Sequence, residues 1–366
     1  MGTGIRVGVI GVGYWGAKQL RVMRGTPGVS SVVAVDARIE HLPDLAHLVA
    51  EGRGFTSLQA ALPHVDAFVI ATPPATHAHL GLQAIEAGKH VLIEKPLATT
   101  TADALLLIAA AREAGVTLMV GHTFEYNAAV WMLRDLVQSR ELGDLYHLTS
   151  SRLNMGLYQS DVNVVFDLAP HDVSIANHVL GQAPSSVTAW GSHHVDPTFE
   201  DVAFLRLDYA DLGAHATIHV SWLDPVKTRR ITAVGSKKMA VYDDTAEERI
   251  RIHDKAVLLP DAGSPARKQY HQGAITSPPI AFDEPLAVQA RHFVDCAVTG
   301  ATPRTDGANG LAVVQVIEAA QLSLAEERRV QLDEILTRSL PHSVAALIPT
   351  PVPSQRNGKV LRTFAS

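Results

Sequence analysis

The chain divides into two stretches that differ in hydrophobic periodicity. Up to about residue 120, short unbroken apolar runs alternate with segments long enough to form helices. Unbroken runs are typical of strands buried on both faces of a parallel sheet. They span residues 5–10, 32–35, 66–71, 90–93 and 116–120. This alternation predicts an α/β domain with a doubly wound parallel sheet over residues 1–123.

From about residue 146 the apolar residues recur with period two. This spacing predicts a mainly antiparallel sheet with one face against helices and the other face open. The candidate strands are residues 146–153, 186–192, 202–209, 214–221, 229–234 and 238–242, and the candidate helices are residues 168–180, 285–299 and 307–327. We therefore expect an α+β domain over residues 124–338, followed by a proline-rich tail over residues 339–366. An open face of this size favours a homo-oligomer, a dimer or a tetramer, formed through it.

Composition narrows the class of protein. The 366 residues are 47% hydrophobic and 19% charged, with a net charge of −6. No Lys/Arg block exceeds two residues, which argues against nucleic acid or an anionic membrane as a partner. The single cysteine, Cys296, excludes an intrachain disulfide, and no leader or run of about eighteen apolar residues is present. We expect a cytoplasmic protein with no membrane contact.

A glycine-rich segment follows the first predicted strand. It runs Gly11-Val12-Gly13-Tyr14-Trp15-Gly16 and precedes a helical stretch. In this context Gly11 permits a tight turn, Gly13 lets the backbone approach a pyrophosphate, and Gly16 permits close helix–sheet packing. The helix N-terminus would present free N–H groups to phosphate. The alternative is an ordinary glycine turn.

The second predicted strand ends at Asp36-Ala37. An acid about 20–25 residues after the glycines is where a carboxylate binds the adenosine ribose in a Rossmann domain. Asp36 would repel a 2′-phosphate, so the sequence favours NAD over NADP, although Arg38 lies nearby. A turn residue at the end of a strand is the alternative.

Two further strands end in polar or proline-containing segments. Thr72 and Pro73 follow the strand over residues 66–71, with His77 at the start of the next helix. Ligands of open α/β sheets bind beyond the carboxyl ends of the strands, so these residues are candidates for cofactor contact. His77 could equally be a structural residue of the first helical turn. Glu94-Lys95-Pro96 ends the strand over residues 90–93, and we expect Lys95 where cofactor meets substrate.

Several motifs occur together in one order. They are the glycine segment, Thr72-Pro73-Pro74 with His77, Glu94-Lys95-Pro96-Leu97, Asp167-Leu168-Ala169-Pro170-His171-Asp172, and Thr305-Asp306-Gly307-Ala308-Asn309-Gly310-Leu311. As a set, they resemble the Gfo/Idh/MocA family of NAD(P)-dependent oxidoreductases over most of residues 4–330. Residues 121–127 and 167–172 look most like the branch acting on nucleotide sugars, of the UDP-N-acetylglucosaminuronate 3-dehydrogenase type. Polyol-oxidising relatives more often carry an arginine-containing motif at Phe124-Glu125-Tyr126.

The resemblance implies roles for four of these residues. Lys95, Asp167 and His171 match the family's catalytic positions, and Glu94 matches a residue close to the nicotinamide ribose. Hydride transfer from an alcohol needs a group that exchanges the hydroxyl proton, for which Lys95 and His171 are candidates. Asp167 would orient the imidazole or hold a substrate hydroxyl, because residues four apart share one helix face. The alternatives are an N-cap role for Asp167, a structural His171 and a surface-exposed Lys95.

The segment between residues 152 and 163 supplies the candidate substrate contacts, Arg152, Asn154, Tyr158 and Asn163, together with His171. Arg152 would pair with a carboxylate or a diphosphate; a solvated strand arginine is the alternative. No Cys, His or Asp cluster has metal-ligand spacing, so we expect no metal.

The sequence hypothesis is an NAD(H)-dependent enzyme that interconverts a secondary hydroxyl and a ketone, at C3 of a nucleotide-linked hexose. The alternatives are a free cyclitol or monosaccharide dehydrogenase, an NAD-dependent glycosidase and a non-catalytic dinucleotide-responsive regulator.

Overall fold

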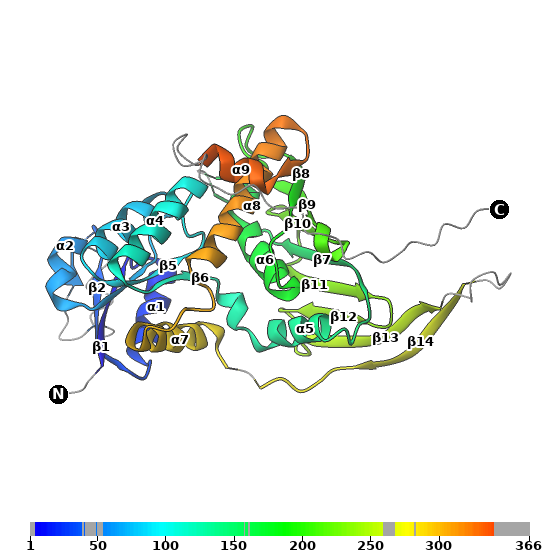
Figure 1. The fold of residues 1–366 in the computed structure, drawn as a ribbon, viewed down its shortest axis with the longest axis horizontal. Helices are drawn as coiled ribbons and strands as arrows, with labels where there is room; N and C mark the ends of the chain where they lie inside the picture. The colour runs from blue at the N-terminus through cyan, green and yellow to red at the C-terminus, as the bar shows by residue number, and fades with distance from the viewer. Residues whose placement is uncertain are drawn as a thin grey trace, which may run out of the picture.

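The computed structural model describes residues 4–38, 40, 49, 54–156, 158–159, 162–258, 268–281 and 283–339. It contains two sheets that lie side by side, the first covered by helices and the second extending away from it (Figure 1). The proline-rich tail predicted after residue 339 lies outside the described residues.

The first sheet is parallel and has the strand order β3-β2-β1-β4-β5-β6. Its strands are β1 (Ile5–Ile10), β2 (Val29–Val35), β3 (Gly54–Phe55), β4 (Ala67–Ile70), β5 (His90–Glu94) and β6 (Leu118–Gly121), and its helices are α1 (Tyr14–Arg24), α2 (Leu58–Ala61), α3 (His77–Glu86) and α4 (Thr101–Ala114). β4 and β6 are buried along their length, and β1, β2 and β5 are buried over their apolar runs, as a sheet covered on both faces requires. The predicted doubly wound sheet is confirmed.

The second sheet has nine strands in the order β14-β13-β12-β11-β7-β10-β9-β8-β15. They are β7 (Leu145–Leu153), β8 (Ser186–Ser192), β9 (Val202–Tyr209), β10 (Ala214–Ser221), β11 (Thr228–Gly235), β12 (Met239–Asp243), β13 (Ile250–Leu258), β14 (Gln269–Thr276) and β15 (Val330–Gln331). Among the described strands of this sheet, β7 and β10 alone pair in parallel, and the other pairs are antiparallel. The mainly antiparallel sheet is confirmed, but β13 and β14 form a projecting hairpin that the sequence did not predict (Figure 1).

Helices α5 (Ala128–Gln138), α6 (Val164–Leu180) and α8 (Gly307–Glu326) pack on the second sheet. Helix α6 begins four residues earlier than predicted, because Asn163 caps it by accepting the Phe166 N–H at 3.1 Å. Asp167 is therefore inside the helix and is not its N-cap. Pro170 lies in the second turn, not the first, so the carbonyl of Phe166 receives no N–H from it.

Two late helices pack back on the first domain, as the sequence predicted. Helix α7 (Pro285–Thr299) contacts α1, and α8 contacts α4. Between them, Thr305 extends the edge of β6 by accepting the Val120 N–H and donating its hydroxyl to the Val120 carbonyl. The chain ends its described part in α9 (Leu332–Ser339).

Helix α8 is also long and apolar enough, by length and composition alone, to span a membrane. It lies between the two sheets and buries Val313, Val316 and Ile317 in the hydrophobic cores. This is the setting of a core helix.

Candidate active site

A cavity of about 450 Å³ opens between the two domains at the carboxyl ends of β5 and β6. It is lined by Trp15, Lys18, Glu94, Lys95, Gly121, Thr123, Phe124, Asn127, Arg152, Leu153, Asn154, Asp167, Leu168, His171, Arg229, Asp244, Arg249, Glu284, Pro285 and Leu286. The cavity therefore brings the end of β5, the start of α6 and the end of β7 together, although these segments are far apart in sequence.

The glycine segment has the geometry that a dinucleotide requires. Gly11 has φ +82°, and a Cβ at Gly16 would lie 1.9 Å from the Gly11 carbonyl oxygen, so neither position tolerates a side chain. A Cβ at Gly13 would meet nothing within 4 Å. The backbone at Gly13 is thus open to a ligand, at the N-terminus of α1. These residues fit NAD.

Asp36 lies beside this turn. Its carboxylate accepts the N–H groups of Val12 and Arg38, each at 2.9 Å. The bond to Val12 ties the end of β2 to the glycine turn and places the acid where a ribose would lie. Ala37 and Pro73 are exposed next to this edge, and Thr72 is half-buried and packs against Gly11.

Aromatic side chains flank the turn. Tyr14 and Trp15 open α1 and are 74% and 48% exposed, with the Lys18 ammonium 4.0 Å and 4.7 Å from their ring centroids. Of the two aromatic residues, only Trp15 lines the cavity. Tyr14 faces solvent and accepts a hydrogen bond from Lys18 at 2.9 Å.

Glu94 ends β5 at the base of the cavity. Its carboxylate accepts the Gln19 amide N–H at 2.6 Å, and burial raises its pKa. A side chain at Gly121 would collide with Glu94, because a Cβ there would lie 2.8 Å from its Oε2. Glycine on β6 therefore leaves room for this carboxylate.

Lys95 is largely buried, with its side chain 18% exposed, and is not a surface residue. Its ammonium donates to the main-chain carbonyl of Asp167 at 2.9 Å and lies 3.9 Å from the Asp167 carboxylate. Burial lowers the pKa of Lys95, against the opposing effects of Asp167 and Glu94. The Lys95–Pro96 peptide bond is cis.

His171 faces the same cavity from α6. Its ring lies edge-on to Phe124, with 5.2 Å between centroids. Burial, and then the positive charges of Lys95 and Arg152, hold its pKa well below 6.5, so the imidazole is neutral at pH 7.

One of the sequence hypotheses was that Asp167 orients the His171 imidazole, and the structure gives Asp167 other partners. The described residues show no hydrogen bond between the two; instead the Asp167 carboxylate accepts the indole N–H of Trp222 at 3.2 Å. The i, i+4 spacing places both residues on one helix face, but Asp167 turns toward Lys95 and Trp222.

Arg152 is not a solvated strand arginine. It is 5% exposed, and Asp172 accepts its Nε–H at 2.5 Å and an Nη2–H at 3.4 Å. Its guanidinium lies 4.8 Å from the centroid of Phe124. Arg152 therefore reaches the cavity wall with its orientation fixed and with N–H groups to spare.

Of the other predicted substrate contacts, one lines the cavity and two lie outside its lining. Asn154 lines the cavity. Tyr158 stands one layer behind it, with its ring 4.7 Å from that of Trp222. Asn163 does not line the cavity; its side chain caps α6 and binds Glu200 and Gln321 at 2.8–2.9 Å.

The structure places His77 in the structural position that the sequence left open, inside the first helical turn of α3. It is completely buried, and its Nδ1 and Nε2 lie 2.8 Å and 2.9 Å from the carbonyl oxygens of Pro96 and Thr72. The imidazole therefore joins the two loops at the carboxyl edge of the sheet from behind.

Several residues that line the cavity were not predicted from the sequence. Arg229 and Arg249 line the wall beside Arg152, and Phe124 forms its floor. Arg229 pairs with Arg152 across β11 and β7 in the sheet register. Only that register, which single-strand patterns do not give, would have revealed the pairing. No group of three or more His, Cys, Asp or Glu within the described part of the chain is arranged to hold a metal.

Comparisons with known proteins agree with this geometry. Residues 5–122 match the model of an oxidoreductase family with an NAD-binding Rossmann fold, and residues 130–241 match the GFO/IDH/MocA C-terminal domain. 2,7-Anhydro-N-acetylneuraminate hydratase of Escherichia coli is 26% identical over 91% of this chain and 98% of its own. Inositol 2-dehydrogenase of Rhizobium meliloti is 24% identical, covering 90% and 99%.

UDP-N-acetylglucosamine 3-dehydrogenase of Acidithiobacillus ferrooxidans is a third relative, 26% identical over 89% of this chain and 99% of its own. Its solved structure superposes with a TM-score of 0.73 over 88% of this chain and 98% of the other. With both domains matched and the glycine turn and interdomain cavity in place, the chain belongs to the Gfo/Idh/MocA family of NAD-dependent oxidoreductases.

Proposed function

We propose that this protein interconverts a secondary hydroxyl and a ketone on a sugar, at C3 of a nucleotide-linked hexose, with NAD(H) as cofactor. One observation carries the proposal: Lys95 from the first domain and His171 from the second face one cavity beside the glycine turn. Gly13, Asp36 and Glu94 would hold the dinucleotide at its pyrophosphate, adenosine ribose and nicotinamide ribose.

In the oxidation direction, a hydroxyl loses its proton to a side chain as the carbinol carbon loses hydride. Bound NAD supplies the hydride acceptor. Burial lowers the pKa of Lys95 from its ordinary value, which favours the unprotonated amine that a base requires, and the pKa of His171 is held well below 6.5. We assign the proton to Lys95, with neutral His171 binding the same hydroxyl. Asp167 positions Lys95 through its carbonyl and carboxylate. In reduction the protonated Lys95 returns the proton.

The cavity wall supports an anionic substrate. Arg152, Arg229 and Arg249 lie along it, contributed by β7, β11 and the turn before β13. Aspartates bind part of each guanidinium, at Asp172 for Arg152 and at Asp244 for the other two. Arg152 and Arg229 keep further N–H groups, which suit the diphosphate of a nucleotide sugar or a sugar carboxylate. An uncharged cyclitol would leave them without a partner.

The test is incubation of purified protein and NAD with a panel of UDP- and dTDP-sugars, following NADH by absorbance. NADH formation with one of them is the expected result. No turnover with any would exclude the nucleotide-sugar version. The same panel extended with inositols and free hexoses identifies a cyclitol or monosaccharide dehydrogenase. NAD that stays bound without net NADH while a glycoside is cleaved would indicate the glycosidase alternative.

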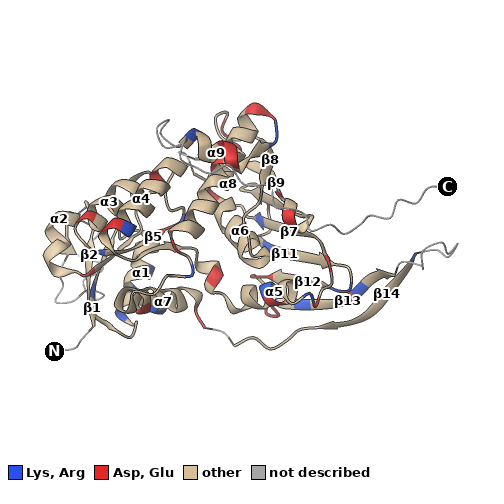
Figure 2. Ribbon diagram, viewed as in Figure 1, with Lys and Arg blue, Asp and Glu red and all other residues tan. Residues whose placement is uncertain are grey.

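The open sheet face supports the expected homo-oligomer. On it Trp190, Phe204 and His219 form a stacked row, with centroids 5.5 Å and 4.1 Å apart, and Trp190 is 52% exposed. A row of aromatic side chains that are exposed or half-exposed suits a second copy of the sheet. Acidic and basic residues are interspersed over both domains (Figure 2), which fits a cytoplasmic protein without a nucleic-acid partner. Light scattering of Trp190→Glu, which should be a smaller species than the wild type, tests the interface.

A further inference from the structure

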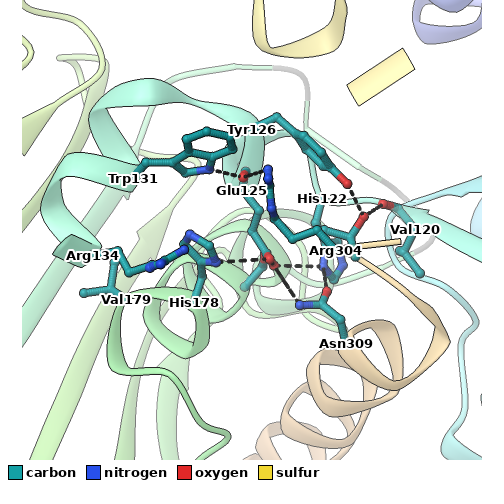
Figure 3. Close-up of polar contacts among 12 residues, drawn as sticks. Val120, His122, Glu125, Tyr126, Trp131, Arg134, His178, Val179, Arg304 and Asn309 are labelled. Carbon is teal, nitrogen blue, oxygen red and sulfur yellow. Dashed lines mark hydrogen bonds and ion pairs between the residues drawn. The ribbon is translucent and has the colours of Figure 1, made fainter. Parts of the chain in front are cut away.

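A second cluster of titratable residues lies behind the cavity, centred on Glu125 (Figure 3). Glu125 belongs to the short 3₁₀ helix η6 (Thr123–Tyr126), which leads from β6 toward the second domain. Its carboxylate is 1% exposed. It accepts hydrogen bonds from the Ser174 hydroxyl at 2.5 Å and the Asn309 amide at 3.1–3.2 Å.

Two imidazoles complete the cluster. His122 Nδ1 lies 3.6 Å and His178 Nδ1 lies 3.5 Å from the carboxylate oxygens of Glu125. Burial alone would raise the pKa of Glu125, but the two nearby imidazoles and the hydrogen bond from Ser174 bring it down to about 2. Glu125 is therefore a buried group that is ionised at neutral pH.

The partners of Glu125 come from three elements that must hold together. His122 directly follows β6, Ser174 and His178 lie on α6, and Asn309 lies on α8. One carboxylate thus links the first sheet, the helix that carries His171 and the helix between the domains.

The Glu125 cluster contacts both segments that surround His171, helix α6 and the 3₁₀ helix η6. Ser174 lies one turn along α6 from His171. Phe124, the neighbour of Glu125 in η6, places its ring 5.2 Å from the His171 ring and 4.8 Å from the Arg152 guanidinium. A displacement of Glu125 would move both the helix that carries the imidazole and the ring that packs on it.

We propose that Glu125 is a positioning residue, which sets the spacing between η6 and α6 and so the place of His171 in the cavity. The role rests on the proposed function, since it matters for turnover only if His171 binds the reacting hydroxyl. Glu125 acts through Phe124 and α6 and does not touch the substrate.

The test compares Glu125→Gln with Glu113→Gln in the full chain; Glu113 is an exposed acid on α4. Loss of bonds to a buried charge should lower kcat of Glu125→Gln about tenfold, with the Kd for NAD within about twofold of wild type. Glu113→Gln should match wild type. Unchanged kcat in Glu125→Gln overturns the proposal. If that variant does not fold, Ser174→Ala should lower kcat about threefold, and unchanged kcat there overturns it equally.

A second readout needs no substrate. In protein labelled with ¹⁵N-histidine, the His171 ring resonance, assigned with His171→Gln, should shift in Glu125→Gln and stay in place in Glu113→Gln. A resonance that does not move overturns the positioning role. If wild type turns over no sugar, the proposed function fails while this measurement still decides on Glu125.

Discussion

The two halves of helix α6 show how differently burial acts on titratable groups. In its first half, His171 lines the cavity beside Lys95 of the first domain; both are partly buried with few partners, and burial lowers the pKa of both. One turn later, Ser174 and His178 face Glu125, whose pKa is lowered to about 2 despite burial. The groups of the first half are pushed toward their neutral forms, whereas the acid facing the second half is held in its charged form.

The difference lies in the number of hydrogen-bond donors. Glu125 has donors from Ser174 and Asn309 and two imidazoles within 3.6 Å, whereas His171 has no hydrogen bond within the described ranges. Acid–base groups that line a cavity with few partners are typical of catalysis, and fully partnered buried ones are typical of structural links. The following predictions test this division.

The largest effect should follow from Lys95→Ala. Removing the proton acceptor should lower kcat by about 10²- to 10⁴-fold, the range of general acid–base catalysis. The Kd for NAD, measured by fluorescence titration, should stay close to wild type, because the glycine turn and Asp36 are untouched. Wild-type turnover in this variant would remove Lys95 from the mechanism.

His171→Ala should be next, with kcat lowered about 10²-fold, because the imidazole binds the hydroxyl whose proton Lys95 takes. Steady-state kinetics with a substrate from the panel provides the measurement. The double variant should be little slower than Lys95→Ala alone, because the two residues act on one proton. If the loss of kcat in the double variant equalled the product of the two single losses, Lys95 and His171 would act separately.

A substitution at Glu125, which faces the second half of α6, should change the free energy of unfolding. The pKa of Glu125 is lowered from 4.5 to about 2. Its ionised form therefore contributes up to about 3 kcal/mol to the free energy of unfolding above pH 4.5, a contribution lost as the pH falls toward 2. Urea unfolding should find Glu125→Gln less stable than wild type at pH 7, with the gap narrowing below pH 4.5. A gap that does not depend on pH would contradict this assignment.

Asp36→Ala should weaken NAD binding about tenfold through loss of the ribose hydrogen bonds, and should reduce the preference for NAD over NADP. The Kd values of both cofactors are the readout. Because Asp36 also accepts the Val12 N–H, Asp36→Asn provides the matched control that retains an acceptor. An unchanged ratio of the two Kd values would show that Asp36 does not select the cofactor.

The smallest effect on activity should come from Asn163→Ala. This residue caps α6 away from the cavity, so the free energy of unfolding should fall by about 1 kcal/mol while kcat stays within about twofold of wild type. A large loss of kcat with unchanged stability would restore Asn163 as a substrate contact.

Most of the fold was predictable from the sequence, because periods of two and unbroken apolar runs report burial directly. The start of α6 was missed, since Asn163 and Asp167 are both good capping residues and only the helix geometry selects one. The strands β13 and β14 were missed because β14 is exposed along its length and lacks an apolar pattern.

The site was predictable as a set of positions but not as a set of contacts. Glu94, Lys95 and His171 meet in the cavity, because motif and sheet edge determine where they lie. Which atom binds which depends on long-range packing, so the bonds of Asp167 to Trp222 and of His77 to Pro96 could not be anticipated. Glu125 and its histidines likewise come together only through the contact of α6, α8 and β6.

The pH dependence of kcat/KM for sugar oxidation tests most directly whether Lys95, which faces the first half of α6, is the base. Because Lys95 must be unprotonated to accept the proton, kcat/KM should rise with pH and then level off. The apparent pKa of this rising limb should lie below the ordinary lysine value of 10.5. The same limb should be absent in Lys95→Ala. A limb confined below pH 6.5 would assign the base to His171, and a profile without a limb, or one unchanged in Lys95→Ala, would contradict the account.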